Sequence, residues 1–421
     1  MPARSRIFYG WWIAGAYFVL NFYWAGTLLI GFSALFNPIR EAFGLSALVA
    51  TAAMQMRQGA AVVGSPLVGY LFDRFGPRPL ILAATFFTAG GMSLLAFSHT
   101  TWQFFLAFAI ASVGFAIFIA GTGPAAMTNW FVRHRGKAIS IVLAGAGMGA
   151  FLIRVVVWLE GEWGWRTALV IIVIGLLIVG IPVSLMLRHR PEQYGLRPDG
   201  EPPDAGPAEE TPVAPRPAQR ADFGFRQALA TRAFWSIAIA SGFAAMGSTS
   251  VAFFFIPHLE DEGLSLATAA WAATAVGVIG VGSTLIAGWL SDYRDRSAII
   301  MLAYLLQGGG IALFAFASSV WHLIPFVLLF GIGARATFPV VSSLLAEYFG
   351  RANFGKIQGV MFSAFTAGGV VGPLIAARIH DVYGTYTPAF AGYAVAMLVS
   401  MAAIGLVRRP RAVSLASPPP T

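Results

Sequence analysis

Charge is scarce in this chain of 421 residues. Only 11% of the residues are charged, against about 25% in an ordinary soluble domain, and 57% are hydrophobic. A chain of this composition cannot cover itself with a polar surface, which excludes an ordinary soluble protein. Apolar runs of about 20 residues, long enough to cross a bilayer, recur along the whole sequence. We therefore expect an all-α membrane protein.

Cysteine is absent, so the chain has neither a disulfide framework nor a cysteine metal site. The sequence also has no recognisable nucleophile–base pair and no metal cluster. The glycine-rich segment Gly121–Pro124 is not a phosphate loop, because it lies inside an apolar run and not between a strand and a helix. The net charge of +9 does not form the continuous basic stripe of a nucleic-acid-binding protein. We expect no enzymatic activity, no cofactor, no metal and no nucleic-acid partner.

Acidic residues are missing from the interior of the apolar runs. None of the 18 Asp and Glu residues lies deep in a run, whereas three arginines do, namely Arg57, Arg154 and Arg335. An unpaired arginine in the middle of a bilayer costs about 2.5–3.5 kcal/mol on insertion scales. An anion that arrives from outside offsets this cost. The charge pattern therefore favours a protein that moves an anion.

Twelve apolar runs predict twelve transmembrane helices, six on each side of a polar segment. The first run is too long for a signal peptide, and we expect it to remain as the first span. The predicted spans are residues 10–36, 47–71, 79–98, 102–127, 138–160, 166–187, 234–257, 266–290, 298–317, 322–346, 356–378 and 386–407.

The polar segment holds eight prolines and many charges, which indicates a flexible linker with a short amphipathic piece near Phe223–Leu229. The predicted organisation is an N-terminal six-helix bundle at 1–187, a cytoplasmic linker at 188–232, a C-terminal six-helix bundle at 233–410 and a cytoplasmic tail at 411–421.

The two halves are related by an internal repeat. The motif Gly69–Asp73 ends the second run, and the similar motif Gly288–Asp292 ends the eighth. Gly136 after the fourth run and Gly355 after the tenth are separated by the same number of positions as these two motifs. One offset for two independent motifs predicts two pseudo-symmetric bundles built from a duplicated six-helix unit.

The basic residues predict the orientation. Of the 27 Lys and Arg residues, 21 fall on the side of the N-terminus, three on the opposite side and three within the runs. Because cytoplasmic loops carry the excess of basic residues, we expect both termini in the cytoplasm of a cell whose plasma (inner) membrane holds the protein.

Two motifs carry a resemblance to a known family. The segment Gly69–Arg78, GYLFDRFGPR, resembles the signature of the loop between spans two and three in the major facilitator superfamily, and Gly288–Arg296 resembles its weaker second copy. Tyr9–Trp12 and the Gly372–Pro373 pair are similar to the bacterial branch that includes monocarboxylate transporters and oxalate/formate antiporters. The resemblance covers the whole chain and implies the major facilitator fold.

The resemblance also implies a mechanism. Two six-helix bundles are expected to rock about a central site lined by spans one, four, seven and ten. Asp73 is expected beside a helix N-terminus of the other half, where it holds the inside closed. The residues implied as the conformational switch are Gly69, Asp73, Arg74, Arg78, Gly288 and Asp292.

The substrate does not follow from the resemblance. The monocarboxylate branch usually carries an Asp–Arg pair in span eight, and here the run 266–290 has no charge. The oxalate type carries an arginine in span eight and a lysine in span eleven, and neither is present.

Arg335 is the leading candidate for substrate binding. It lies about 12 residues from either end of its run, or roughly 18 Å along a helix, too far for its side chain to reach water along the helix. It must face a cavity or another protein group, and the alternative role is a structural arginine bound to backbone carbonyls. Its neighbours Gly331, Gly333 and Pro339 indicate close packing or a local break.

The other candidates have competing roles. Arg57, beside Gln55, either contacts the substrate or locks the two bundles together. Arg154 contacts the substrate, reaches the membrane surface or pairs with an acidic residue at the same mouth, Glu160 or Glu162. Two polar residues in the middle of span one are further candidates for substrate contact: Asn21 and Tyr23.

The spans offer no Asp, Glu, His or Lys at depth, which favours exchange or facilitated movement over a dedicated proton relay. Proton coupling through the carboxyl group of the substrate stays open. We expect a secondary active transporter of a small organic anion, a mono- or dicarboxylate, with a counter-anion or a proton as partner and a monomer sufficient in the bilayer. The alternatives are an efflux pump for neutral or amphiphilic compounds and a transporter-like membrane sensor.

Overall fold

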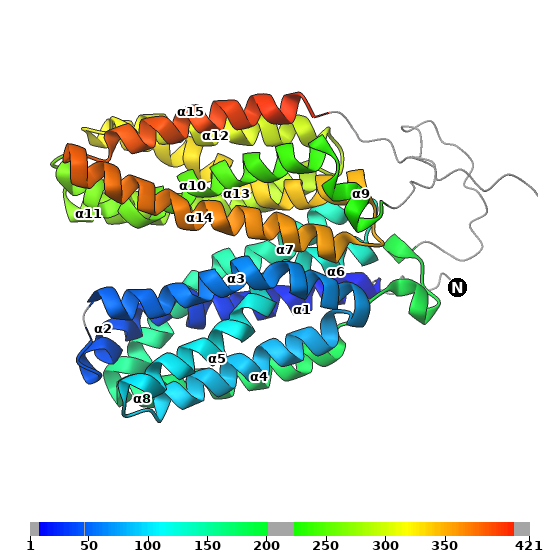
Figure 1. The fold of residues 1–421 in the computed structure, drawn as a ribbon, viewed down its shortest axis with the longest axis horizontal. Helices are drawn as coiled ribbons and strands as arrows, with labels where there is room; N and C mark the ends of the chain where they lie inside the picture. The colour runs from blue at the N-terminus through cyan, green and yellow to red at the C-terminus, as the bar shows by residue number, and fades with distance from the viewer. Residues whose placement is uncertain (1–7, 46, 201–222, 408–421) are drawn as a thin grey trace, which may run out of the picture.

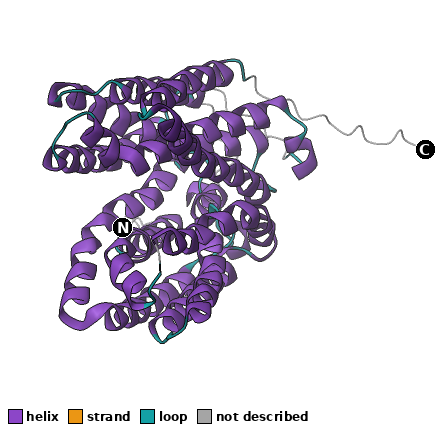
Figure 2. Cartoon of the chain, turned by 60° about the vertical axis from the view of Figure 1, so that its left-hand side comes forward, coloured by secondary structure: helices purple, strands orange, loops and turns teal. Residues whose placement is uncertain are grey.

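The computed structural model describes residues 8–45, 47–200 and 223–407, and every regular element in these ranges is a helix (Figure 2). The expected tail at 411–421 and residues 201–222 of the expected linker lie outside the described residues. The helices form two halves that lie one above the other in Figure 1. We call the end at which the chain passes from one half to the other the linker end, and the opposite end the distal end.

The N-terminal half holds the first six spans. Several of its spans consist of more than one helical segment. The elements are α1 Tyr9–Tyr23, η1 Trp24–Ile30, α2 Phe32–Ala42, α3 Ala47–Phe75, α4 Pro77–Ala96, α5 Thr101–Ile119, α6 Thr122–Trp130, α7 Arg135–Met148, η2 Gly149–Leu152 and α8 Ile153–Met186.

The segment between the halves and the C-terminal half follow. The expected short amphipathic piece is present as α9. Each span of the second half is a single element, although α10 has a kink at Phe254, where φ is −105° and ψ is 19°. The elements are η3 Pro191–Tyr194, η4 Pro198–Gly200, α9 Phe225–Leu229, α10 Arg232–Asp261, α11 Leu266–Leu290, α12 Arg296–Ala315, α13 Val320–Phe349, α14 Phe354–Tyr383 and α15 Thr387–Gly405.

The predicted count of twelve membrane helices agrees with the structure. Ten stretches of the described residues are long and apolar enough to cross a membrane. One of them, Arg135–Met186, has 52 residues and turns at Gly164, where φ is 74° and ψ is 163°, so it makes two crossings. The 29-residue α3 is the remaining crossing. Across the two halves, α3 packs on α14 and α7 packs on α11.

Two spans of the N-terminal half are less regular than predicted. Span four breaks between α5 and α6 at Gly121, where a φ of 85° requires glycine. Span one contains the π-helical segment η1, a form that often occurs at functional sites. In span ten, by contrast, α13 runs through Pro339 without a break. The unusual sequence around Arg335 therefore serves close packing: a Cβ on Gly333 would lie 2.4 Å from the backbone nitrogen of Gln307.

The first part of the linker is docked, in contrast with the flexible linker expected from its prolines. The Asp199 carboxylate accepts hydrogen bonds from the backbone N–H groups of Val132, Arg133 and His134 at 2.9, 2.8 and 3.3 Å. The Arg188 guanidinium lies 4.2 Å from the ring centre of Tyr9. These contacts fix residues 188–200 against the loop that follows span four.

Glycines set the distance between the central helices in both halves. A Cβ on Gly145 of α7 would lie 2.3 Å from the carbonyl oxygen of Phe18 in α1. A Cβ on Gly368 of α14 would lie 2.1 Å from the carbonyl oxygen of Gly242 in α10. The neighbours are backbone atoms, which cannot move aside as a flexible side chain can. Small residues at these positions allow the close helix packing that stabilises proteins in lipid.

We predict that Gly368→Ala destabilises the protein, because the added methyl group forces α14 away from α10. Overpacking of this kind costs about 1–3 kcal/mol. Thermal unfolding of the purified protein, followed by intrinsic tryptophan fluorescence, should show a lower Tm. The matched control is Gly392→Ala in α15, where nothing lies within 4 Å of the added Cβ and Tm should not fall. An equal Tm for the two variants would contradict this account of the packing.

Candidate functional site

The first contact between the halves at the linker end centres on Asp73, at the end of α3. The backbone N–H groups of Gly355 and Lys356, in the first turn of α14, donate to its two carboxylate oxygens at 2.9 and 3.0 Å. A carboxylate at a helix N-terminus satisfies free N–H groups and meets the positive end of the helix dipole, worth about 0.3–1 kcal/mol and up to ~2 kcal/mol when partly buried. A Cβ on Gly69 would lie 2.1 Å from the carbonyl oxygen of Gly355, so only glycine permits this approach.

The second contact is the copy of the first in the internal repeat. The N–H groups of Gly136 and Lys137 at the start of α7 donate to the Asp292 carboxylate at 2.7 and 2.9 Å. A Cβ on Gly288 would lie 2.5 Å from the carbonyl oxygen of Gly136, so glycine is again required. We refer to these two arrangements as the Asp73 contact and the Asp292 contact.

Within the described part of the chain, the basic residues of the loop signature, Arg74 and Arg78, do not bridge the halves. Arg74 donates to the hydroxyl group of Tyr70 in its own helix at 3.3 Å, and Arg78 is exposed. Arg351 crosses between the halves instead: it donates to the carbonyl oxygen of Asn129 and pairs with Glu192 of the docked linker at 3.0 Å. Sequence reasoning missed Arg351, although it lies in the loop that follows span ten, beside the repeated Gly355.

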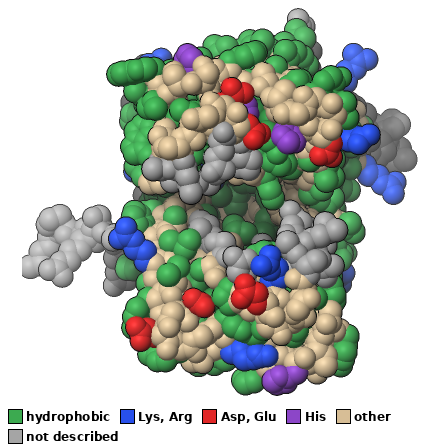
Figure 3. Space-filling view, turned by 90° about the vertical axis from the view of Figure 1, so that its left-hand side faces the viewer, with side chains coloured by type: hydrophobic (Ala, Val, Ile, Leu, Met, Phe, Trp, Pro, Cys, Tyr) green, Lys and Arg blue, Asp and Glu red, His purple; other side chains and the backbone are tan. Residues whose placement is uncertain are grey.

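Hydrogen bonds between the halves extend only part of the way along the molecule. The one farthest from the linker end among the described residues joins the Ser363 hydroxyl to the carbonyl oxygen of Val62 at 2.6 Å. On the other side, Gly147 of α7 lies against Val281 of α11. Seen from the distal end, the molecule is hollowed between its two halves, and much of the described wall is hydrophobic (Figure 3). The described part of the structure is therefore closed at the linker end and hollowed at the distal end.

Arg335 lies midway along α13. Its side chain is accessible to solvent although protein atoms surround it on most sides. This combination indicates that Arg335 lines a space inside the molecule and does not lie on the outer surface. A Cβ on Gly280 of α11 would lie 2.6 Å from its Cγ, so the arginine stem runs along the face of α11. Among the described residues no acidic side chain pairs with the guanidinium, and no carbonyl group accepts a hydrogen bond from it.

Asn21 and Tyr23 play different parts in α1. The half-buried Asn21 donates from Nδ2 to the carbonyl oxygen of Tyr17 one turn earlier at 2.9 Å, which leaves its amide oxygen without a described partner. The Tyr23 hydroxyl donates to the carbonyl oxygen of Ile172 in α8 at 2.7 Å. Tyr23 therefore ties span one to span six within its own half.

The remaining candidates are not brought to Arg335 by any described contact. Arg154 is exposed at the start of α8, and among the described side chains it forms no ion pair with Glu160 or Glu162. The side chains of Arg57 and Gln55 lie outside the described part of the structure.

Two buried amides were missed by the search for charged residues. Gln358 of α14 donates to the Ser342 hydroxyl at 3.2 Å and lies directly against Gly121, the break in span four of the other half. Gln307 of α12 donates to the Ser248 hydroxyl of α10 at 2.9 Å. The available signal was an amide inside an apolar run. Gln307 places a polar group near the middle of α12, whereas Gln358 lies in the second turn of α14, near the linker end.

Burial changes the acidity of the two carboxylates at the linker end, which lie beyond the apolar spans. Loss of contact with water raises the pKa of Asp73 from 3.8 to about 6, although the N–H donors of Lys356 and Gly355 and the charges of Lys356 and Arg190 act in the opposite direction. The same cause raises the pKa of Asp292, where the nearby Arg296 opposes it.

Comparison with known proteins places the chain in a family. The sequence profile of the Major Facilitator Superfamily matches residues 12–294 and 237–420. Monocarboxylate transporter 13 of Bos taurus is 25% identical over 332 residues, which cover 78% of this chain and 72% of that protein. The Fujikurins efflux protein of Gibberella fujikuroi is 32% identical over 133 residues, 30% of this chain and 27% of that protein.

A solved structure shares the fold. The crystal structure of the human organic anion transporter MFSD10 (TETRAN) aligns with a TM-score of 0.72 at 15% sequence identity, covering 94% of this chain and 99% of that one. With the profile match, the span count and the repeated contacts of Asp73 and Asp292, the chain belongs to the Major Facilitator Superfamily of membrane transport proteins.

Proposed function

We propose that this protein is a secondary active transporter that moves a small organic anion, a mono- or dicarboxylate, across the membrane by alternating access. The observation that carries the proposal is Arg335, a guanidinium on an internal space with no acidic partner among the described residues. Arginine matches a carboxylate with two parallel hydrogen bonds, and the interaction is strongest where water is scarce. The carboxylate of the substrate would supply the negative charge that pairs with Arg335.

The names of two similar proteins agree with this substrate class. One is a monocarboxylate transporter and the other an organic anion transporter. Their identities of 25% and 15% are too low to transfer a substrate. They support the broad class of a small anion, while the choice of acid depends on the side chains around Arg335.

The arrangement of the halves supports alternating access. The excess of basic residues at the linker end favours a cytoplasmic position for this end, and in that orientation the distal hollow faces outward. To release substrate inward, the halves must break the Asp73 and Asp292 contacts and close at the distal end. Because each contact consists of hydrogen bonds to one helix terminus, it separates as a unit without unfolding either half.

A second candidate function is efflux of a neutral or amphiphilic compound. The match to the Fujikurins efflux protein favours it over 30% of the chain, and the hydrophobic wall of the hollow would suit such a compound. Under this alternative Arg335 has a structural role, and its substitution changes stability more than substrate selectivity. The two functions therefore differ in what an Arg335 variant does to the uptake of acids.

The first prediction concerns uptake of labelled lactate, pyruvate, oxalate, malonate and succinate into proteoliposomes. We expect at least one acid to be transported, and Arg335→Ala to reduce its kcat/KM by about 10- to 100-fold, since a hydrogen bond to a charged group is worth about 1.5–3 kcal/mol. The kcat/KM of Arg335→Lys should lie between those of the parent and Arg335→Ala, because lysine keeps the positive charge but loses the two parallel hydrogen-bond donors of the guanidinium.

Arg378→Ala is the matched control, because Arg378 is an exposed arginine on α14 of the same half. It should transport at the parental rate. If folded protein transports none of the acids, or if Arg335→Ala transports as well as Arg378→Ala, the anion proposal is wrong and efflux becomes the better interpretation.

The second prediction concerns pH. The pKa of Asp73 is raised to about 6 in the present conformation and should return toward 3.8 when the linker end opens to water. The present conformation then binds the proton more tightly, so its population rises as pH falls through 6. Linkage gives a shift of about tenfold between pH 7 and pH 5.

The shift can be followed by pulsed EPR between spin labels at Leu185→Cys and Leu406→Cys, two exposed positions at the linker end of a chain that has no cysteine of its own. Acidification should increase the short-distance population. Asp73→Asn should weaken this response, leaving the part that belongs to Asp292. A distance distribution that is constant from pH 7 to pH 5 would refute the assignment.

A further inference from the structure

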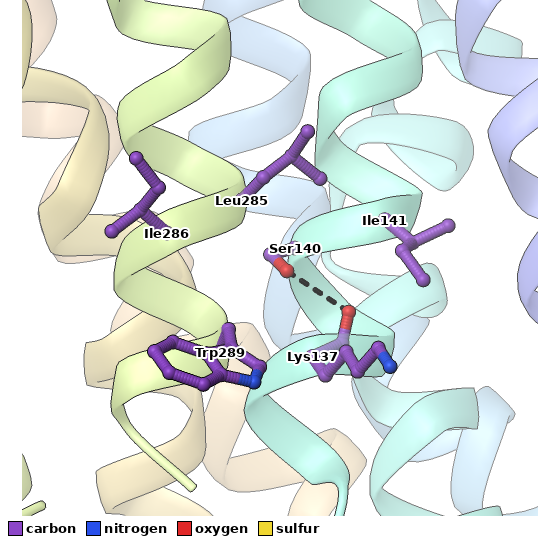
Figure 4. A pocket seen from close by; sticks show the side chains of 6 residues that line it. All are labelled: Lys137, Ser140, Ile141, Leu285, Ile286 and Trp289. Atoms are coloured by element: carbon purple, nitrogen blue, oxygen red, sulfur yellow. Dashed lines mark hydrogen bonds between the residues drawn. The ribbon is translucent and has the colours of Figure 1, made fainter.

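A pocket of about 280 Å³ lies between α7 and α11, at the interface of the two halves near the linker end. Side chains from both helices line it (Figure 4). They are Lys137, Ser140 and Ile141 from α7, and Leu285, Ile286 and Trp289 from α11.

The internal repeat shows why the pocket is present on this side. The repeat relates Lys137 to Lys356, and it relates Trp289 to Tyr70 in the same way. At the α3–α14 interface the Lys356 ammonium lies 5.2 Å from the ring centre of Tyr70, across the two halves, and contacts Asn353. Among the described residues, the equivalent contact between Lys137 and Trp289 is missing at the α7–α11 interface.

Lys137 turns to its own half instead. Its ammonium lies 5.4 Å from the ring centre of Trp11 in α1. Figure 4 shows the lysine pointing away from Trp289, which leaves space between the two side chains. One interface is therefore closed by a cation–aromatic contact, and its copy is open.

The pocket faces the lipid. Ile286 and Trp289 are 65% and 51% exposed, and both belong to the membrane-crossing segment Trp271–Leu290. Exposed apolar side chains on such a segment contact hydrocarbon, and tryptophan near the end of a span marks the level of the lipid headgroups. The occupant that reaches this pocket in a membrane is an amphiphile whose polar end lies beside Lys137.

The polar end of the amphiphile is expected to be negatively charged, because Lys137 is positively charged. No acidic side chain pairs with its ammonium among the described residues, and the nearby Asp292 carboxylate is occupied by backbone N–H groups and almost fully buried. We propose that this pocket binds an acidic phospholipid, with the phosphate at Lys137 and one acyl chain along Ile141, Leu285 and Ile286. Its volume is below the roughly 300–1,000 Å³ of sites for drug-sized molecules and suits one segment of a chain.

The bound lipid contacts both halves at once. It is held in full only while α7 and α11 lie together, so it stabilises the conformation that is closed at the linker end. This consequence for the transport cycle rests on the proposed function, whereas lipid binding itself does not.

Native mass spectrometry of the full chain tests binding directly. The protein is purified in detergent and mixed with equal amounts of phosphatidylglycerol and phosphatidylcholine. We expect the parent to retain phosphatidylglycerol preferentially. Lys137→Gln should lower this preference about fivefold, as one cation near a membrane surface implies. The matched control is Lys356→Gln. This repeat-related lysine lies over Tyr70 of the other half, donates to Asn353 and does not line the pocket, so its loss should keep the preference.

A second variant separates the pocket from a general charge effect. Leu285→Trp fills the pocket without changing charge and should also reduce retained phosphatidylglycerol. In nanodiscs, the Leu185→Cys and Leu406→Cys labels should show a larger population closed at the linker end with phosphatidylglycerol than with phosphatidylcholine, and Lys137→Gln should remove the difference. If the parent has no preference, or if Lys137→Gln and Lys356→Gln lose it equally, the proposal is overturned.

Discussion

The structure depends on the contact between a carboxylate of one half and a helix N-terminus of the other. Lipid solvates apolar side chains well, so no hydrophobic force comparable to that in water holds two helical bundles together. Asp73 and Asp292 supply polar attachment instead, each accepting two backbone N–H groups. Such contacts hold only at van der Waals approach of the helices, which explains glycine at 69 and 288. Because they are polar and close to water, the proposed mechanism can separate them without exposing the interior of either half.

The fold was predictable because the sequence features that specify it are either local, as the apolar runs are, or repeated, as the motifs of the two halves are. Apolar runs give the spans, and the constant offset between repeated motifs gives the two-fold arrangement and the relation of Gly69 to Gly288. The irregular features were not predictable for a common reason. The break at Gly121, the π-helical segment Trp24–Ile30 and the docking of Asp199 depend on partners far away in the chain. Hydropathy does not encode such partners, since a broken helix and a continuous one have the same composition.

The candidate site divides in the same way. A search for charge in apolar runs finds Arg335 and Arg154, and the distance of Arg335 from both ends of its run ranks it first. The surroundings of each arginine depend on the packing of several helices and need the structure. It selects Tyr23, whose hydroxyl is bound to Ile172, and it passes over Gln358, whose amide is neutral. Charge thus identifies the side chains that are energetically costly to place in a bilayer. Uncharged polar side chains carry a much smaller cost, so the sequence alone does not single them out and the structure is needed to find them.

Duplication gives the transporter two interfaces that need not remain alike. The Asp73 and Asp292 contacts are equivalent, yet their surroundings have diverged: Lys356 closes one interface over Tyr70, while Lys137 leaves a pocket beside Trp289. The arginine environments differ too, because Arg296 lies 4.0 Å from Asp292 and pairs with Glu347, whereas Arg74 beside Asp73 stays within its own helix. Under the proposed mechanism, both contacts must separate for the linker end to open. Under that mechanism a change at either interface shifts the whole equilibrium, so one copy can respond to its surroundings while the residues around Arg335 stay unchanged.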